Sequence, residues 1–467
     1  MEDTMLTYAM ENRGTAPLYE YLYRCIRADI LSGKLPAGEK LPSRREFAEH
    51  LRVSVMTVEG AYRQLEAEGY ITARPRQGFF VSALETLPVR PAAFAPALPQ
   101  REEQTWKLDL RSNRVDAGRF PMAAWAKLVR QVLSEGGEAL LSPIPHQGLL
   151  ELRRAIAADL GAYRGMPVSP EQIVVGAGAE YLYMLLGQLL GREAVIAVED
   201  PGYPKIRQVY TACGMAVRSV ALDGEGMDLA ALRRSGANVA HISPAHHYPT
   251  GLVTPIARRQ ALLKWAEETG GYLIEDDYDS EFRFTGRPIP TLQSIDTAGR
   301  VIYMNTFSQT SSPSMRLGFA VLPPRLLEKY RRELDFYACT VPALEQMVLA
   351  RFLDRGAYEQ HLARMRKEYR TRRVAVLAAF RASPFAHRIR IMEQGAGLHF
   401  LLTLSTARTD GELKARAEEL GVRLSFLSEY AAATPVPPHT LVVNYAGLDP
   451  QKLPRAMELL EAVFEEY

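Results

Sequence analysis

The most informative segment of this 467-residue chain is Asn305-Thr306-Phe307-Ser308-Gln309-Thr310-Ser311-Ser312-Pro313-Ser314-Met315-Arg316-Leu317-Gly318-Phe319. Hydroxyl side chains fill it, and an apolar run follows Arg316. The Arg316 guanidinium is always charged and forked, so it suits an anion. Gln309 stands inside the stretch, and its carboxamide nitrogen is not nucleophilic enough to condense with an aldehyde as an amine does. Arg316 therefore makes this stretch a candidate anion-binding segment, and Gln309 does not offer it an amine.

A glycine-rich turn precedes this stretch in the chain. Gly176-Ala177-Gly178-Ala179-Glu180 follows the apolar run Ile173-Val174-Val175 and opens a predicted helix. Backbone N–H groups at a helix start can hold a phosphate, which makes the turn a candidate anion site. Glu180 opposes that interpretation, because a carboxylate repels a dianion. A tight strand-to-helix turn without a ligand is the alternative.

Two further segments place polar side chains beside apolar runs. Tyr272-Leu273-Ile274-Glu275-Asp276-Asp277-Tyr278 is predicted to be a strand with acids at its carboxyl end, where α/β sheets bind ligands. Glu199-Asp200-Pro201-Gly202-Tyr203 offers a tyrosine ring that could stack on a flat ligand. The alternatives are a solvated acidic loop and a packed turn residue.

The chain is long enough for two or three domains. Residues 83–107 contain four prolines among alanines and lose hydrophobic periodicity, which predicts a semi-rigid linker. Residues 108–467 alternate short apolar strands with amphipathic helices, the pattern of an α/β domain. Residues 1–82 form a separate, largely helical unit.

The first 82 residues predict a winged helix-turn-helix. Apolar residues recur at helical spacing over residues 18–31. Ser43 and Ser54 are candidate N-caps of a second and a third helix. Residues 69–81 are predicted to form a β-hairpin. This order of elements places the second motif helix in the major groove of DNA.

Composition narrows the class of protein. With 47% hydrophobic and 24% charged residues, the chain is predicted to be soluble and globular. Its net charge of +2 gives no overall signal for nucleic acid or membrane. The acidic start and the lack of long apolar runs predict no membrane partner and a cytoplasmic location. Cys25, Cys213 and Cys339 are far apart, which argues against a disulfide framework or a zinc site.

Three runs of the N-terminal unit carry a family resemblance. Leu41-Pro42-Ser43-Arg44-Arg45, Val53-Ser54-Val55-Met56-Thr57-Val58 and Leu65-Glu66-Ala67-Glu68-Gly69-Tyr70 resemble the GntR-type DNA-binding domain over residues 17–82. The resemblance implies a DNA-facing set that mostly holds phosphate, with a minority reading bases. That set is Arg44, Arg45, Ser54, Thr57, Arg74, Arg76 and Gln77. A solvated surface is the alternative for any single arginine.

Residues 1–82 hold eleven Lys and Arg and eleven Asp and Glu, so this unit is neutral overall. One copy is therefore expected to bind DNA weakly. We expect the affinity to come from a homodimer that contacts two half-sites of a promoter.

From Asp109 onward, the order of motifs is similar to that of class I and II aminotransferases, which bind pyridoxal phosphate (PLP). The whole chain resembles the MocR/GabR branch of GntR regulators. The resemblance implies a fold type I α/β domain, with a mostly parallel sheet and helices on both faces. It places Gln309 at the position of the lysine that holds PLP. It implies a cofactor pocket lined by Gly178, Ala179, Glu180, Tyr203, Asp276, Tyr278, Thr306, Ser308, Gln309 and Arg316.

The same resemblance implies a role for several of these side chains. Tyr203 would cover the pyridine ring, Asp276 would face its nitrogen, and Tyr278 would face its phenolic oxygen. Thr306, Ser308 and Arg316 match phosphate-side positions.

The chain also departs from the aminotransferase pattern. Pro143-Ile144-Pro145-His146-Gln147-Gly148 lacks the tyrosine that reaches a partner's phosphate, and Glu180 stands where a neutral residue is usual. The last predicted strand, residues 441–446, lacks the arginine that binds a substrate carboxylate. Lys205 and Arg423 are candidate replacements. The adjacent His246 and His247 predict no metal site, because sequence neighbours rarely bind one ion.

These features predict a DNA-binding regulator that senses a small effector in its aminotransferase-like domain. The candidate effectors are PLP bound without a covalent bond, an adduct of PLP with an amino acid, and another small anion. No catalytic turnover is expected, because the lysine normally also takes the substrate's Cα proton. Two alternatives stay open: a PLP enzyme that uses Tyr278 or His247 as its base, and a dimerisation scaffold that binds no ligand.

Overall fold

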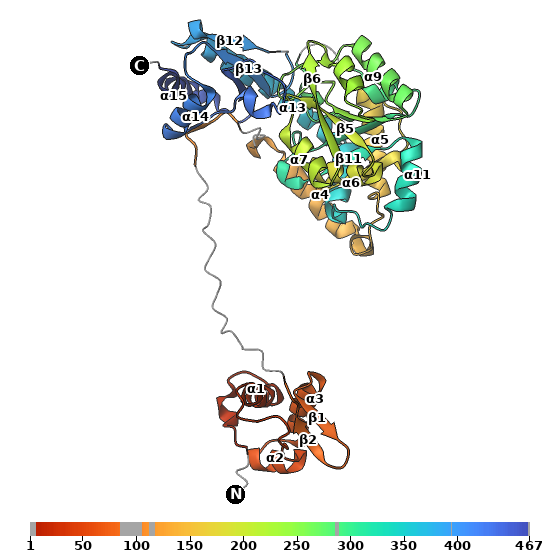
Figure 1. The fold of residues 1–467 in the computed structure, drawn as a ribbon, viewed down its shortest axis with the longest axis vertical. Helices are drawn as coiled ribbons and strands as arrows, with labels where there is room; N and C mark the ends of the chain where they lie inside the picture. Colours follow the sequence, from red (N-terminus) through yellow and green to blue (C-terminus); the bar gives the residue numbers. More distant parts are fainter. Residues whose placement is uncertain (1–5, 85–104, 112–116, 285–288, 394, 466–467) are drawn as a thin grey trace. The chain divides into compact units, whose positions relative to one another are not determined.

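The computed structural model describes residues 6–84, 105–111, 117–284, 289–393 and 395–465. Its internal contacts divide the chain into two units, Met1–Glu103 and Gln104–Tyr467 (Figure 1). Most of the predicted linker at residues 83–107 lies outside the described residues. No helix in the described ranges is long and apolar enough to cross a bilayer.

The N-terminal unit is a winged helix-turn-helix, as predicted. Its elements are α1 (Leu18–Leu31), α2 (Arg44–Leu51), α3 (Val55–Ala67), β1 (Ile71–Arg74) and β2 (Gly78–Val81). The two strands pair antiparallel and form the wing. Buried apolar side chains from all three helices and from the wing share one core.

Two serine caps fix where the motif helices begin. The Ser43 Oγ accepts a hydrogen bond from the Glu46 amide (3.3 Å), and α2 starts at the next residue. The Ser54 Oγ accepts one from the Thr57 amide (3.1 Å), and α3 starts at the next residue. Each cap satisfies an amide that has no partner within its own helix.

An eight-stranded sheet forms the centre of the C-terminal unit. Its strands are β4 (Ile173–Gly176), β5 (Val195–Asp200), β6 (Ala216–Asp223), β7 (Gly226–Met227), β8 (Val239–Ile242), β9 (Tyr272–Asp276), β10 (Val301–Thr306) and β11 (Gly318–Val321). They lie in the order β4-β11-β10-β9-β8-β5-β6-β7. The pairings from β10 to β6 are parallel, whereas β11 and β7 pair antiparallel with their neighbours. The predicted mostly parallel sheet is confirmed.

Helices cover both faces of this sheet. Val174 of β4 packs in one apolar cluster with α6 (Ala179–Leu190), α7 (Pro204–Ala212) and α11 (Pro324–Glu333). Its neighbour Val175 packs in another cluster, on the opposite face of the sheet. The helices on that face are α4 (Met122–Glu135), α5 (Leu150–Asp159), α8 (Leu229–Arg234), α9 (Ile256–Thr269), α10 (Leu292–Ile295) and α12 (Ala343–Asp354). Because successive side chains of a strand point to opposite faces, this split explains why the strands are apolar throughout.

A smaller lobe completes the C-terminal unit. Its elements are α13 (Ala357–Ala382), β12 (Ile389–Met392), β13 (His399–Leu404), α14 (Asp410–Glu419), β14 (Val422–Arg423), β15 (Thr440–Asn444) and α15 (Leu453–Phe464). The strands β12, β13 and β15 form an antiparallel sheet. The short strand β3 (Leu108–Asp109) pairs parallel with β14. The chain therefore enters this lobe directly after the predicted linker.

Candidate ligand-binding site

A cavity of about 610 Å³ lies at the carboxyl ends of the parallel strands. Its volume is typical of a small-molecule site, and the carboxyl edge of an α/β sheet is the expected place. Nine of the ten residues predicted for the pocket line it. They are Ala179, Glu180, Tyr203, Asp276, Tyr278, Thr306, Ser308, Gln309 and Arg316.

Gly178, the tenth residue, lies directly beside the lining. It has φ +85°, a conformation that glycine adopts without strain. A Cβ atom at Gly178 would lie 3.1 Å from Cζ of Arg316. The glycine therefore leaves room for the Arg316 guanidinium at the start of α6.

Glu180 is paired with two cations at one side of the cavity. Lys205 Nζ donates to Glu180 Oε1 at 2.5 Å, and Arg316 Nη2 donates to Glu180 Oε2. The hydrogen bond from Lys205, followed by that from Arg316, lowers the pKa of the Glu180 carboxyl. The expected repulsion between Glu180 and an anion is thus offset by two positive charges on the same carboxylate.

Asp276 is held from behind by two partners. Tyr183 donates to Asp276 Oδ2 at 2.6 Å, and His241 Nε2 lies 3.3 Å from the same oxygen. Asp276 is almost fully buried. Both of these contacts are made to Oδ2, and the Asp276 side chain lines the cavity.

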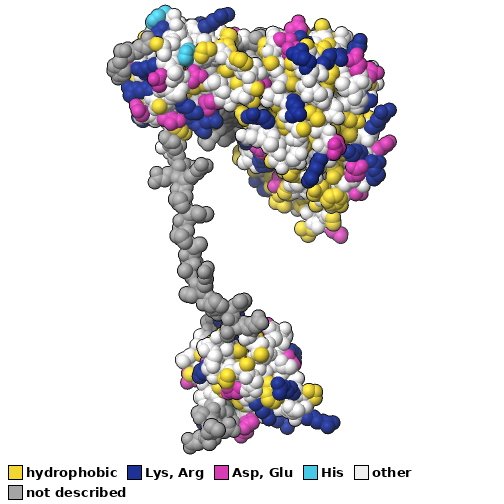
Figure 2. Space-filling model, viewed as in Figure 1, with side chains coloured by type: hydrophobic (Ala, Val, Ile, Leu, Met, Phe, Trp, Pro, Cys, Tyr) yellow, Lys and Arg dark blue, Asp and Glu magenta, His cyan; other side chains and the backbone are white. Residues whose placement is uncertain are grey.

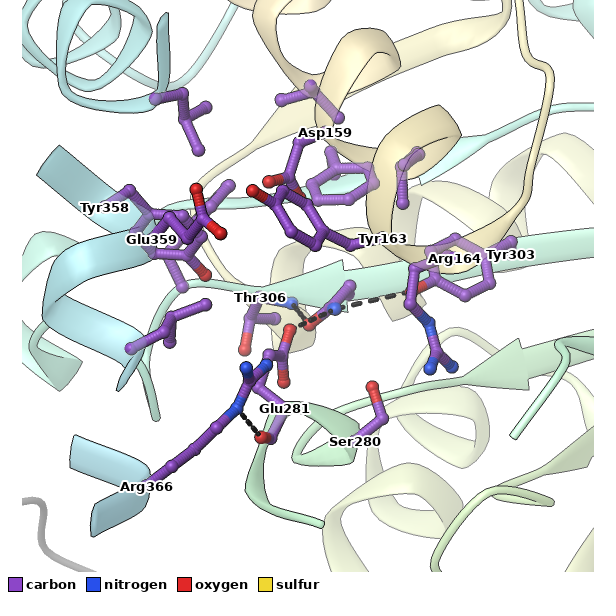
Figure 3. A pocket seen from close by; sticks show the side chains of 17 residues that line it. Asp159, Tyr163, Arg164, Ser280, Glu281, Tyr303, Thr306, Tyr358, Glu359 and Arg366 are labelled. Carbon is purple, nitrogen blue, oxygen red and sulfur yellow. Dashed lines mark hydrogen bonds between the residues drawn. The ribbon is translucent and has the colours of Figure 1, made fainter. Parts of the chain in front are cut away.

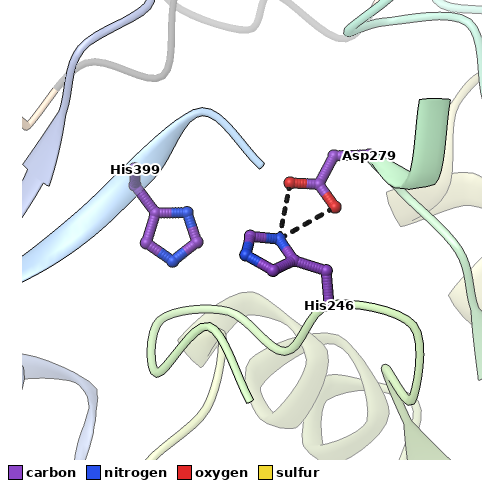
Figure 4. Close-up of side chains that lie close together, drawn as sticks. All are labelled: His246, Asp279 and His399. Carbon is purple, nitrogen blue, oxygen red and sulfur yellow. Dashed lines mark hydrogen bonds and ion pairs between the residues drawn. The ribbon is translucent and has the colours of Figure 1, made fainter. Parts of the chain in front are cut away.

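Tyr278 contacts a buried polar cluster of His246, Asp279 and His399. Figure 4 shows the three side chains of this cluster. The Tyr278 hydroxyl lies 3.3 Å from Nδ1 of His246, and His246 Nδ1 lies 2.9 Å from Asp279 Oδ2. His399 Nε2 lies 3.0 Å from the carbonyl oxygen of Pro249. This cluster fixes the position of the phenol at the cavity wall.

The ligand atoms that His246, Asp279 and His399 could offer to a metal lie within 4.8 Å of one another. Ligands of one zinc ion sit at about 2.0–2.2 Å from the metal, and therefore about 3.3 Å apart. Two of these atoms, His246 Nδ1 and Asp279 Oδ2, are 2.9 Å apart and hydrogen-bonded to each other.

Glu199 and His247, the latter a candidate base, form a second polar pair in the cavity, and the sequence does not indicate that the two are paired. Glu199 Oε2 accepts a hydrogen bond from the Ser243 amide (2.9 Å) and lies 3.4 Å from His247 Nε2. Burial raises the pKa of the Glu199 carboxyl to about 8 and lowers the pKa of His247 to about 3. Near pH 7 the carboxyl is mostly protonated and the imidazole is neutral.

The Gln309 side chain lines the cavity between these groups. Its Oε1 is buried and has no hydrogen-bond partner among the described residues. A buried polar atom without a partner costs about 1–3 kcal/mol. The amide is therefore a group that a ligand could satisfy.

Of the two cations that the sequence offers as carboxylate-binding groups, Lys205 and Arg423, only Lys205 lines the cavity. Arg423 does not line it, because its Nη1 lies 3.4 Å from Asp109 Oδ2 and its guanidinium lies over the Trp106 ring. Lys205 does line the cavity but is bound to Glu180. Arg111 also lines it. No sequence motif pointed to Arg111, because only the pairing of β3 with β14 brings it there.

A second cavity of about 100 Å³ shares Thr306 with the first (Figure 3). Three acids line it, Asp159, Glu281 and Glu359, and burial raises the pKa of Asp159 to about 6 and that of Glu281 to about 7. Arg366 Nε donates to the carbonyl oxygen of Glu281 at 2.6 Å. This smaller space has room for a few water molecules behind the main cavity.

The predicted DNA-facing residues lie on α2, α3 and the wing. Arg44 Nη1 lies 3.3 Å from Glu59 Oε1, and the Arg74 guanidinium lies 4.3 Å above the Phe80 ring. The hydroxyls of Ser54 and Thr57 are 2.8 Å apart and belong to the α3 cap. The remaining three, Arg45, Arg76 and Gln77, are exposed. Figure 2 shows Lys and Arg side chains gathered on the side of this unit that carries the hairpin.

Comparisons with known proteins match both units. The family "Aminotransferase class I and II" matches residues 105–460, and "Bacterial regulatory proteins, gntR family" matches residues 18–81. The solved structure of LysN, an alpha-aminoadipate aminotransferase from Thermus thermophilus complexed with N-(5′-phosphopyridoxyl)-L-leucine, is 26% identical. It superposes with a TM-score of 0.66 and covers 76% of this chain and 92% of that one.

Two relatives match both units together. YdeL of Bacillus subtilis (strain 168), an uncharacterized HTH-type transcriptional regulator, is 36% identical over 96% of this chain and 97% of that protein. The probable rhizopine catabolism regulatory protein MocR of Rhizobium meliloti is 32% identical over 97% of this chain and 95% of that protein. This chain therefore belongs to the aminotransferase class I and II family, within the group of HTH-type transcriptional regulators that carry a gntR-type DNA-binding domain before it.

Proposed function

We propose that this protein is a cytoplasmic, homodimeric transcriptional regulator whose aminotransferase-like domain senses a small ligand and has no turnover. The observation that carries the proposal is Gln309, a side chain without an amine, in the main cavity of a chain that begins with a winged helix-turn-helix. Gln309 stands where the resemblance expects the PLP lysine. The cavity would then bind a ligand reversibly.

The residues present fit PLP as a non-covalent ligand. Gly178 leaves space beside Arg316, where an extra Cβ would crowd the guanidinium, and this corner suits the phosphate. The Asp276 carboxylate would accept a hydrogen bond from the protonated ring nitrogen, and the Tyr278 hydroxyl would meet the phenolic oxygen. When bound, the cofactor supplies an electron-withdrawing ring that can stabilise negative charge. A PLP–amino acid adduct and another small anion are the other candidate ligands.

The two residues considered as replacement bases are poorly suited to that task. A base works best when its pKa is near the working pH. The pKa of His247 lies at about 3, so its neutral imidazole is a weak base. Burial raises the pKa of Tyr278 well above its usual value, so its hydroxyl keeps its proton. The lowered pKa of His247 and the raised pKa of Tyr278 both support a ligand-binding role for the cavity over catalytic turnover.

Ligand binding would regulate DNA binding through the dimer. A ligand changes an equilibrium only by its differential affinity for the two states. A ligand that favours one arrangement of the dimer would change how well two DNA-binding domains reach two half-sites.

The DNA role is tested with the Arg44→Ala/Arg45→Ala double variant and a promoter fragment from upstream of the protein's own gene. We expect the parent to bind with strong salt dependence. The variant should bind more weakly, with a slope of log K against log [salt] smaller by about one to two. Arg24→Ala/Lys34→Ala removes the same charge from α1 and its C-terminal end and is the control. Equal binding by parent and double variant would disprove the assignment.

A further inference from the structure

Arg111 lines the main cavity from the smaller lobe. Its side chain is about 44% exposed, and Nη1 lies 3.9 Å from Glu429 Oε2. That distance is too long for a hydrogen bond. The Glu429 carboxylate already accepts hydrogen bonds from Lys414 Nζ (2.9 Å) and from the Phe426 amide (3.0 Å). Glu429 is therefore near Arg111 but is held by other partners.

The backbone of Arg111 is fixed on both sides. Its amide donates to Asp109 Oδ1 at 3.0 Å, and its carbonyl oxygen accepts from Asn444 Nδ2 at 3.1 Å. The backbone N–H of Asn444 also donates to the carbonyl oxygen of Leu110 at 3.0 Å. Asn444 belongs to β15, the strand in which the aminotransferase resemblance implies a carboxylate-binding arginine. In this chain that strand positions an arginine from another segment.

The other cations of the cavity already have carboxylate partners. Arg316 and Lys205 both bind Glu180. Among the cations that line the cavity in the described ranges, Arg111 is the one without a hydrogen-bonded carboxylate. A guanidinium offers five N–H donors in a rigid fork that matches a carboxylate. The Arg111 side chain thus has the donors and the position to receive a ligand carboxylate.

We propose that Arg111 recognises the carboxylate of an amino-acid-type ligand in this cavity. Arg111 belongs to the smaller lobe, whereas Arg316, the candidate phosphate ligand, follows a strand of the large sheet. This inference rests on the proposed function and narrows it. A phosphopyridoxyl group linked to an α-amino acid carries both a phosphate and a carboxylate, and it matches the two cationic groups. PLP alone lacks the carboxylate and leaves Arg111 unused.

The location of Arg111 also suggests how binding is transmitted. Arg111 follows β3, the first strand after the predicted linker to the DNA-binding domain. A ligand held by Arg111 and Arg316 would tie this strand to the large sheet. The ligand would then stabilise the position at which the linker leaves the aminotransferase-like domain.

The test compares N-(5′-phosphopyridoxyl)-L-leucine with its leucinamide counterpart, which differs only at the carboxylate. Affinities are measured by calorimetry on the full-length protein, so no catalytic activity is needed. We expect the parent to prefer the acid over the amide by about tenfold, as for a charge-assisted hydrogen-bonded pair. Arg111→Gln should reduce this ratio to about one and leave the affinity for the amide unchanged. Arg233→Gln, which removes an exposed guanidinium on α8 outside the cavity, is the control and should keep the parent's ratio.

Each other outcome contradicts the inference in a distinct way. An unchanged ratio in Arg111→Gln, or a parent that binds acid and amide equally, would overturn the role of Arg111 while leaving the ligand-sensing proposal intact. Equal loss of both probes in Arg111→Gln would show that Arg111 does not act on the carboxylate. A parent that binds neither probe would overturn this inference together with the phosphopyridoxyl ligand of the proposed function.

Discussion

At the scale of single residues, Gln309 determines how a ligand can be held. The amide lines the cavity, and its Oε1 has no hydrogen-bond partner in the described part of the chain. Gln309→Lys would place an amine in the same position. We expect the variant to keep PLP and a visible absorbance band after desalting, because an amine condenses with an aldehyde. The parent and the amine-free control Gln309→Met should both lose the cofactor. A parent that stays coloured would contradict the proposed binding mode.

Gly178 is a second single-residue determinant of the site. Its φ of +85° strains any larger residue, and a Cβ there would lie 3.1 Å from the Arg316 guanidinium. We expect Gly178→Ala to destabilise the fold by about 1 kcal/mol or more and to weaken binding of PLP. Gly214 has a similar φ of +76°, and a Cβ added there would meet no atom within 4 Å. Gly214→Ala should therefore cost similar stability and leave binding unchanged, as measured by urea unfolding and calorimetry.

At the scale of elements, Ser54 has two competing roles. The sequence predicts a DNA contact, and the structure shows its hydroxyl capping α3. Ser54→Ala should lower the free energy of opening α3 by about 1 kcal/mol, measured by amide hydrogen exchange in the full chain. Ser54→Asp preserves the cap but adds a negative charge near phosphate. If Ser54 faces DNA, Ser54→Asp should lose affinity while α3 keeps its protection; unchanged affinity would leave Ser54 with the cap alone.

Local patterns explain which elements and site residues could be predicted. Short runs of sequence encode the serine caps, the apolar strand β4 and the acids at the end of β9. The sequence therefore predicts α2, α3, β4 and β9 where the structure has them. Arg111, Tyr183 and Glu199 were missed as site residues because their partners are distant in sequence. Asn444 lies 333 residues from Arg111, and Asp276 lies 93 residues from Tyr183. The sequence makes Arg423 a candidate for the site, yet its pairing with Asp109 through the β14–β3 ladder keeps it out of the cavity.

At the scale of the whole molecule, the C-terminal unit buries several acids close to its sheet. Burial raises the pKa of Glu199 to about 8 and that of Glu281 to about 7, from an ordinary value of 4.5. Between the ordinary and the raised value, the folded protein keeps a proton that the unfolded chain releases. The stability from these protonated acids is complete below pH 4.5 and is lost as the pH rises through each folded-state pKa.

The resulting prediction compares Glu199→Gln and Glu281→Gln with the parent from pH 5 to pH 9. Each amide keeps the shape of the protonated acid but cannot ionise. Relative to Glu199→Gln, the parent should lose about 1.4 kcal/mol of unfolding free energy per pH unit up to about pH 8. Relative to Glu281→Gln, the loss should level off near pH 7, one unit earlier. Urea unfolding followed by tryptophan fluorescence reports this unit, because Trp106, Trp125 and Trp265 all lie in it. Parallel stability curves for the parent and both variants would show that these carboxyls ionise as freely in the folded protein as in the unfolded chain.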